Sequence, residues 1–204
     1  MEDNWGHSKK LHTYRYEILF NGIEASDVYK NKNVLELAPF MGWFSEELNK
    51  SCEQLDLVEL HPTATNHLNE IFKKEIITKK VNVYASDIHH QIFQLEPIYN
   101  LVTCCGFLYH TPHPFWVLEG IAKLSPQYIL IDTHCGDQAV YLKDSGKINQ
   151  YGMRQSRQPT VPYNLVISDD VLLKSMEKLG YELLLKVDKT HADVSHLNLP
   201  EEFS

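Results

Sequence analysis

The sequence predicts an α/β protein, a three-layer sandwich in which helices cover both faces of a mostly parallel sheet. Three observations predict this fold class. Short apolar runs alternate along the chain with helical stretches, as in proteins built from strand–helix–strand units. Several of these runs are apolar throughout, which is typical of parallel strands buried on both faces. The 204 residues, 43% of them hydrophobic, are enough for one ordinary core, so we expect a single domain over 1–204.

The strands are predicted from short runs of aliphatic and β-branched residues that turn-forming residues bound. In the run 81–87, apolar residues also alternate with polar ones. The chain after Lys189 has poor strand character, so the last strand of the sheet stays uncertain. We expect strands at 33–38, 55–60, 81–87, 99–105, 127–134 and 181–188.

The helices are predicted from apolar residues at helical spacing and from capping residues at their ends. Pro114 occupies a first-turn position, Ser168 is a good N-cap, and Gly180 suits the end of the helix that Ser168 opens. The stretch 12–30, ahead of the first strand, is expected to be a helix that packs against the sheet or covers the site. Further helices are expected at 43–51, 63–74, 114–125 and 168–180.

The segment 135–167 is the one long stretch without a regular pattern. Irregular segments of this length inside a compact domain are often lids or binding loops. The segment contains Arg154 and Arg157, which would bind an anion or a phosphate, or would belong to an ordinary solvated loop. We expect a long irregular insert or lid at 135–167 that helps to choose the substrate.

Composition and charge argue against several classes of protein. No window approaches the ~20 apolar residues of a membrane span, and the N-terminus lacks the apolar core of a secretory signal, so we expect a cytoplasmic protein with no membrane contact. The net charge of −8 argues against strong non-specific binding to nucleic acid. The four cysteines and eleven histidines form no paired metal motif, so no metal is expected. The oligomeric state stays unknown.

A carboxylate stands at the end of each of the first three predicted strands. Ligands of open α/β sheets bind beyond the carboxyl ends of the strands. Glu59 lies about twenty residues beyond the first turn, where an acid can receive two ribose hydroxyls, although it could be a surface acid. Asp87 could accept from an adenine amino group or be an ordinary loop residue. Glu36 could hold an ammonium group through water, anchor the turn, or cap the next helix.

The turn after the first strand reads Ala38-Pro39-Phe40-Met41-Gly42. Nucleotide-binding turns at this place usually carry three glycines, because the backbone must take positive φ or let a ligand approach closely. Here Ala38 and Phe40 stand at two of the three glycine positions. We expect Phe40 to have a negative φ and to turn its ring aside. Phe40 and Trp43 would then be core anchors or would line the pocket.

The sequence resembles class I S-adenosylmethionine (SAM)-dependent methyltransferases, which have a Rossmann-like fold. The resemblance covers roughly 13–188, taken as the core of the domain, and its motifs are NVLELAPFMGWFSEEL, LDLVELHP, VNVYASDIH and YNLVTCCGFLYHTPHPFWVLEGIAKLSPQYILIDTH. The stretch GFLYHTPHPFWVLEGIAKL is the most specific, and it is similar to methyltransferase domains related to the tRNA wobble-uridine carboxymethyltransferase group. The two replaced glycines depart from the family pattern.

The resemblance implies a place for each part of the cofactor SAM. The methionine end would lie near Glu36 and the turn 38–42, the ribose on Glu59, and the adenine by Asp87 and Ile88. The strand-four end would open onto the substrate. The residues expected at the cofactor are Glu36, Ala38, Pro39, Phe40, Gly42, Trp43, Glu59, Leu60, Asp87, Ile88, Cys105 and Gly106.

Tyr109 and His110 are the candidate catalytic residues, with His110 as a general base because imidazole titrates near neutrality. Substrate binding is expected at Tyr109, His110, His134, Arg154 and Arg157. Cys104 and Cys105 are interpreted as buried small residues, in preference to nucleophiles.

The expected function is transfer of the sulfonium methyl of SAM by in-line displacement. The acidic balance favours a small-molecule acceptor over RNA. One alternative is a SAM-binding protein without methyl transfer, either inactive and regulatory or active in lyase or carboxymethyl-transfer chemistry. A nicotinamide dehydrogenase is disfavoured, because the turn lacks the G-x-G-x-x-G pattern.

Overall fold

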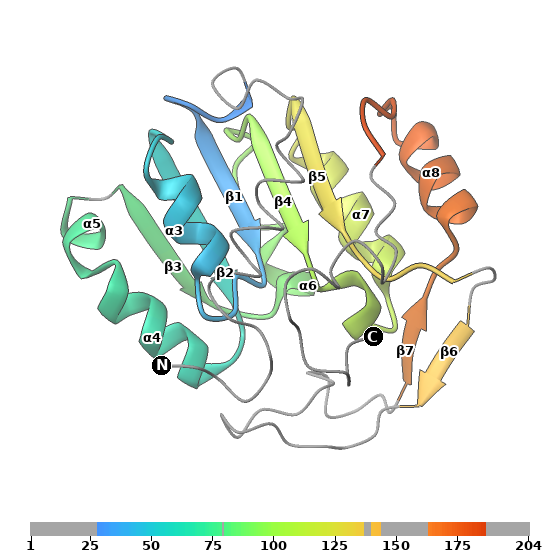
Figure 1. The fold of residues 1–204 in the computed structure, drawn as a ribbon, viewed down its shortest axis with the longest axis horizontal. Helices are drawn as coiled ribbons and strands as arrows, with labels where there is room; N and C mark the ends of the chain where they lie inside the picture. Colours follow the sequence, from blue (N-terminus) through green and yellow to red (C-terminus); the bar gives the residue numbers. More distant parts are fainter. Residues whose placement is uncertain (1–27, 79, 137–139, 144–162, 187–204) are drawn as a thin grey trace, which may run out of the picture.

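A five-stranded parallel sheet forms the centre of the molecule (Figure 1). The computed structural model describes residues 28–78, 80–136, 140–143 and 163–186. The strand order is β3-β2-β1-β4-β5, so the order reverses between β1 and β4. Every neighbouring pair in this sheet runs parallel. The strands are β1 (Asn33–Leu37), β2 (Gln54–Glu59), β3 (Val81–Ala85), β4 (Leu101–Cys105) and β5 (Tyr128–Asp132).

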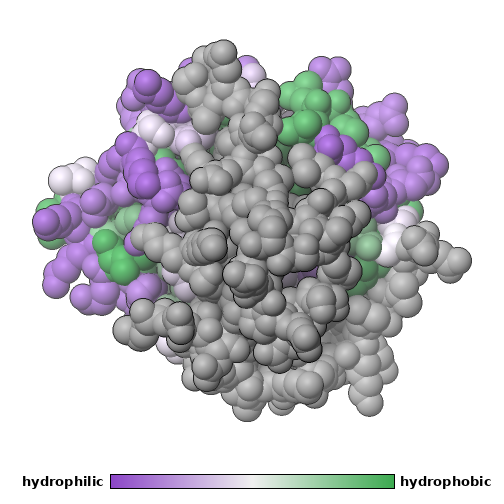
Figure 2. All heavy atoms as spheres, in the orientation of Figure 1, coloured by the Kyte–Doolittle hydropathy of each residue, from purple (hydrophilic) through white to green (hydrophobic). Residues whose placement is uncertain are grey.

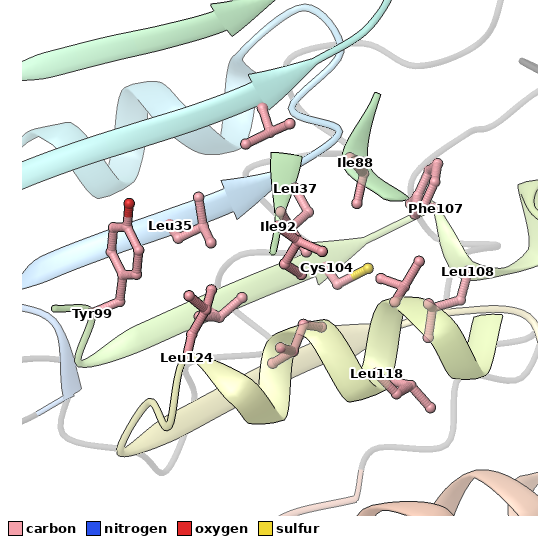
Figure 3. Packing of buried hydrophobic residues seen from close by; sticks show 14 residues of the cluster. Leu35, Leu37, Ile88, Ile92, Tyr99, Cys104, Phe107, Leu108, Leu118 and Leu124 are labelled. Carbon is pink, nitrogen blue, oxygen red and sulfur yellow. The ribbon is translucent and has the colours of Figure 1, made fainter. Parts of the chain in front are cut away.

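Helices cover both faces of the sheet, which confirms the predicted three-layer α/β sandwich. The apolar side chains of β1 alternate between two cores: Val34 belongs to one, and Leu35 and Leu37 belong to the other. The first core contains residues of α3 and α4, and the second contains residues of α6, η1 and α7 (Figure 3). The helices are α3 (Trp43–Asn49), α4 (Pro62–Ile71), α5 (Lys73–Ile77), α6 (Ile88–Gln91), η1 (Leu108–His110), α7 (Pro114–Lys123) and α8 (Asp169–Lys178).

The first five predicted strands are confirmed within a few residues at each end. The predicted ends of α8 are confirmed too. Ser168 caps it, with its Oγ accepting from the N–H of Val171 at 3.4 Å, and Gly180 follows its end with φ 91°. The predicted helix 63–74 is divided into α4 and α5, because Phe72 leaves helical geometry at φ −103° and ψ 19°.

The sixth predicted strand, 181–188, is wrong over its described part. Residues 181–186 form no strand, and Leu183, Leu184 and Leu185 are 57%, 65% and 43% exposed. Figure 2 shows hydrophobic atoms at the upper right, over the region of this segment. An apolar run becomes a strand only where a neighbouring strand accepts its hydrogen bonds, and within the described residues none pairs with this segment. The Tyr181 N–H donates instead to the Met176 carbonyl at 3.0 Å.

The predicted insert 135–167 is not irregular throughout. Its described parts form an antiparallel two-stranded sheet of β6 (Val140–Lys143) and β7 (Tyr163–Val166). Local periodicity could not reveal this pair, because each strand has four residues and its partner lies twenty residues away along the chain. Residues 144–162 lie outside the described residues, as do 12–27 of the predicted N-terminal helix. Among the described helices, none has the length and apolar content needed to cross a membrane.

Candidate functional site

The three strand-end acids lie at one edge of the sheet, next to the point where the strand order reverses. Leu37, at the end of β1, is in register with Val58 of β2, and Glu59 is in register with Ala85 of β3. Parallel neighbours in register bring their carboxyl ends to the same edge. Open α/β sheets bind ligands at this edge, at the point where the strand order reverses, which here lies between β1 and β4.

Glu59 holds the turn that follows β1. One carboxylate oxygen accepts from the Phe40 N–H at 3.1 Å, and the other accepts from the His61 N–H at 2.8 Å. The residue is 0% exposed, so the interpretation of Glu59 as a surface acid is wrong. A carboxylate is an acceptor of several hydrogen bonds, which is the property that ribose hydroxyls need. Binding of ribose by Glu59 stays a prediction.

The turn has the backbone of a glycine-rich loop although two of its glycines are replaced. Ala38, Phe40 and Gly42 have φ of 54°, 55° and 78°. The expected negative φ of Phe40 is therefore wrong. The left-handed conformation costs a non-glycine residue about 1–2 kcal/mol, and here it directs the Phe40 N–H at the buried Glu59 carboxylate, a charge-assisted bond that offsets the cost.

The ring of Phe40 lies beside Trp43. The two ring centroids are 6.0 Å apart at 61°, an edge-to-face arrangement, and both residues are half-buried. Neither residue is therefore a fully buried core anchor. Pro39 is buried in the same turn. The position of the ring relative to the methyl path stays a prediction.

Gly42 is required by packing as well as by its backbone. A Cβ on Gly42 would lie 2.7 Å from Leu68 Cδ2 and 3.0 Å from Ile71 Cδ1, both on α4. The distance to Leu68 is shorter than real Cβ contacts, and the distance to Ile71 is tighter than most of them. Leu68 is 0% exposed, so it has little room to move. Because α4 packs directly over the third glycine position of the motif, this position has no room for a side chain.

Glu36 is buried at 3% exposure on the face of β1 that α3 covers. Ser45, also buried, lies in α3 with its Oγ 2.5 Å from Glu36 Oε2. Burial raises the pKa of Glu36 to about 8, and the Ser45 hydrogen bond opposes the rise. Gly42 occupies the N-cap of α3, so the alternative role of Glu36 as the cap of that helix is wrong. Its role toward a methionine ammonium stays a prediction.

Asp87 is the N-cap of α6 and lies just beyond β3. Its Oδ1 accepts from the His89 N–H at 2.8 Å and lies 2.7 Å from His89 Nδ1. Its other oxygen accepts no hydrogen bond from the described residues. Ile88 is buried at 3% and packs into the second core, whereas Leu60, beyond β2, is 37% exposed.

The substrate-side candidates come together where β4 and β5 end. The Gly106 N–H donates to the Asp132 carbonyl at 2.7 Å, and Gly106 has φ 80°, which turns the chain from β4 into η1. The Tyr109 ring is 4.2 Å from that of His110 and 4.4 Å from that of His134. The structure thus brings these three predicted residues together. Arg154 and Arg157 lie outside the described residues.

The chemistry of Cys104 agrees with its interpretation as a small buried residue. It is 0% exposed, and burial raises its pKa to about 12, far from a reactive thiolate. Cys105 is half-buried at the end of β4, and its place beside a cofactor stays a prediction. All four cysteines are thiols. Within the described residues, no group of three His, Cys, Asp or Glu side chains could hold a metal ion.

Sequence reasoning missed His89, Thr111 and Ser45. His89 lies 2.7 Å from Asp87 on one side and 2.7 Å from Thr111 Oγ1 on the other. The adjacent pair His89-His90 is visible in the sequence, but as a metal motif it is incomplete. The one available signal was its position two residues after a strand-end acid, since the Thr111 partner is 22 residues away.

Comparisons with known proteins show the fold. No protein-family model and no curated protein matches the sequence. A SAM-dependent methyltransferase from Leishmania major superposes with a TM-score of 0.60 at 14% identity, over 86% of this chain and 65% of that one. A Burkholderia thailandensis 1,6-didemethyltoxoflavin-N1-methyltransferase, with 1,6-didemethyltoxoflavin and S-adenosylhomocysteine (SAH) bound, superposes with a TM-score of 0.58 at 12% identity, over 84% of this chain and 68% of that one. The cyclase SpnF gives 0.56 at 12% identity over 89% and 63%. The chain therefore has the Rossmann-like fold of the class I SAM-dependent methyltransferases.

Proposed function

We propose that the protein is a SAM-dependent methyltransferase. One observation supports this most strongly: a turn with positive φ at all three glycine positions lies beside acidic side chains at the ends of three adjacent strands. A nucleoside attached to a charged amino acid needs an acceptor for its base, an acceptor for its hydroxyls, and a close backbone approach. Asp87, Glu59 and the turn 38–42 offer these three features in that order along the sheet edge, from β3 to β1.

The residues fit SAM as follows in our proposal. Glu59 accepts ribose hydroxyls, and Asp87 accepts from the adenine amino group with Ile88 beneath the base. The turn and Glu36 receive the methionine end, and Cys105 with Gly106 borders the sulfonium. SAM supplies an electrophilic methyl group. The protein contributes alignment and exclusion of water, which can account for a large share of such a barrier.

The acceptor would bind over the Tyr109, His110 and His134 cluster. His110 is proposed as the base for a nucleophile whose proton must leave, with Tyr109 against its ring. A small molecule is favoured over RNA, because the chain carries a net charge of −8 and the Burkholderia thailandensis neighbour acts on a small molecule. The likeness to tRNA wobble-uridine enzymes keeps RNA as the second acceptor class. The segment 135–167 and the N-terminal stretch would select the acceptor in a single cytoplasmic domain.

The second candidate function is SAM binding without methyl transfer. The observation in its favour is the side chain of Phe40, which stands where other loops of this type have no side chain. The cyclase among the structural neighbours also shows that this fold supports other reactions. This candidate includes a regulatory protein, a SAM lyase and a carboxymethyl transferase.

Isothermal titration with SAM and with SAH tests the proposal. Binding of both ligands supports the proposed function. A protein that binds neither SAM nor SAH would reject both candidate functions together. Incubation of the protein with SAM alone then separates the candidates, since a lyase would release methylthioadenosine or a lactone without an acceptor. Incubation with methyl-labelled SAM and metabolite or tRNA pools would transfer label to one of the pools if the protein is a methyltransferase.

A further inference from the structure

A hydrogen-bonded series of side chains joins the end of β3 to the loop that follows β4. His89 stands in the middle, with its Nδ1 2.7 Å from Asp87 Oδ1 and its Nε2 2.7 Å from Thr111 Oγ1. Thr111 is 0% exposed and lies directly after η1. The Thr111 carbonyl accepts from the Leu165 N–H of β7 at 3.0 Å, so the series reaches the second sheet.

The protons of this series can be assigned from its acceptors. An ionised carboxylate accepts and cannot donate, so the proton on the neutral imidazole belongs to Nδ1, facing Asp87. Nε2 is then the acceptor, and the Thr111 hydroxyl donates to it. The Thr111 oxygen in turn accepts from the His113 N–H at 3.0 Å. Each nitrogen of the ring then has one role, Nδ1 as a donor and Nε2 as an acceptor, which fixes the tautomer and orientation of the His89 ring.

The ring of His89 is also held by packing. Its centroid is 6.1 Å from that of Phe107 and 6.2 Å from that of His113, the latter at 90°. The His89 side chain is 14% exposed, whereas that of Asp87 is 40% exposed. A carboxylate that exposed would rotate between orientations if a single backbone N–H held it. Two donors from His89 on the same oxygen remove that freedom.

We propose that His89 is a positioning residue that makes the site selective for adenine. By holding Oδ1 of Asp87, it presents Oδ2 to the 6-amino group of the base. A base with a carbonyl at that position would place an acceptor against a carboxylate and would be rejected. This inference rests on the proposed function, and it adds a residue that acts through Asp87 without touching the ligand.

The test compares two ligands that differ at this one position, SAH and S-inosylhomocysteine, by isothermal titration on the full chain. The wild-type protein should bind SAH about 10–100-fold more tightly, the range for one charged hydrogen bond. Asp87→Asn should lose most of this ratio. The ratio of the two affinities cancels any general weakening of the site, so a purely structural role of His89 would leave it unchanged.

Two substitutions of His89 separate its two contacts. The Asn side chain places its amide nitrogen near the position of Nδ1, so His89→Asn keeps the donor to Asp87 and should keep most of the ratio. The Gln side chain reaches the position of Nε2, so His89→Gln keeps the Thr111 contact, loses the donor to Asp87, and should lower the ratio about tenfold. A wild-type ratio in His89→Gln would overturn the proposal.

Further outcomes keep the test decisive. If neither His89 variant folds, Thr111→Val should lower the ratio by releasing the ring, and Thr111→Ser, which keeps the hydroxyl, should preserve it. An unchanged ratio in Thr111→Val would then overturn the proposal. A wild-type protein that binds both ligands equally would reject adenine selectivity while keeping the proposed function, and one that binds neither would reject the proposed function itself.

Discussion

The backbone N–H of Phe40 lies 3.1 Å from the carboxylate of Glu59, although nineteen residues separate the two along the chain. This bond joins the turn after β1 to the end of β2. It also explains how a phenylalanine occupies the place of a glycine, since the residue must adopt φ 55° to point its N–H at the acid. The loop is thus shaped by a buried acceptor, and no glycine is needed at that position.

In this turn, glycine should be at least as favourable for stability as alanine, whereas in ordinary backbone glycine is the less favourable of the two. In ordinary backbone, glycine is less stable than alanine by about 0.5–1 kcal/mol, but at φ 54° the left-handed conformation costs alanine about 1–2 kcal/mol. We expect Ala38→Gly to keep or raise the free energy of unfolding, measured in urea. We expect the Phe40→Gly protein to have a higher free energy of unfolding than the Phe40→Ala protein. The control Ala122→Gly, inside α7, should lose about 1 kcal/mol. A loss of that size at Ala38 would contradict the positive φ.

Glu59→Ala should weaken the binding of SAM and SAH by about 1–3 kcal/mol, measured by isothermal titration, because charged hydrogen bonds to the ligand and to the turn are both lost. Glu53→Ala is the matched control, since Glu53 is an exposed acid just before the same strand and its loss changes the net charge equally. Equal affinities in the wild-type and Glu59→Ala proteins would reject the ribose assignment.

The buried Glu36 should make stability depend on pH. Its pKa is raised from 4.5 to about 8, so the folded state holds a proton that the unfolded state has released. The stabilising contribution is full below pH 4.5 and is lost as the pH rises to about 8. The free energy of unfolding should therefore fall over this range, by an amount on the order of a few kcal/mol. In Glu36→Gln, which keeps an acceptor for Ser45, this part of the slope should vanish; an unaltered slope would contradict the burial argument.

Gly42→Ala and Gly180→Ala form a matched pair, because both positions have positive φ, 78° and 91°. A Cβ at Gly180 meets nothing within 4 Å, whereas at Gly42 it overlaps Leu68 and Ile71. Gly180→Ala should lose about 1–2 kcal/mol from backbone strain alone. Gly42→Ala should lose about 1–3 kcal/mol more from overpacking. Equal losses in thermal unfolding would show that α4 does not press on the turn.

Much of the molecule could be predicted from the sequence because the signals are local. The apolar runs placed β1 to β5, and Ser168 with Gly180 placed the ends of α8. The acids after β1, β2 and β3 were visible because strand ends are marked by the change from apolar to polar residues. Tyr109 and His134 were both predicted to bind the substrate, and their rings lie together because β4 and β5 end at the same edge of the sheet.

The sequence by itself therefore determined the succession of strands and helices along the chain, the parallel sheet, and the edge of the sheet at which the acids lie. The tertiary structure decided the positive φ of Phe40, the burial of Glu59, the His89–Thr111 contact and the absence of a strand over 181–186. The physical reason is the range of the interactions involved. Periodicity and capping act over a few neighbouring residues, whereas a hydrogen-bond partner or a pairing strand is supplied by a part of the chain that only folding brings near.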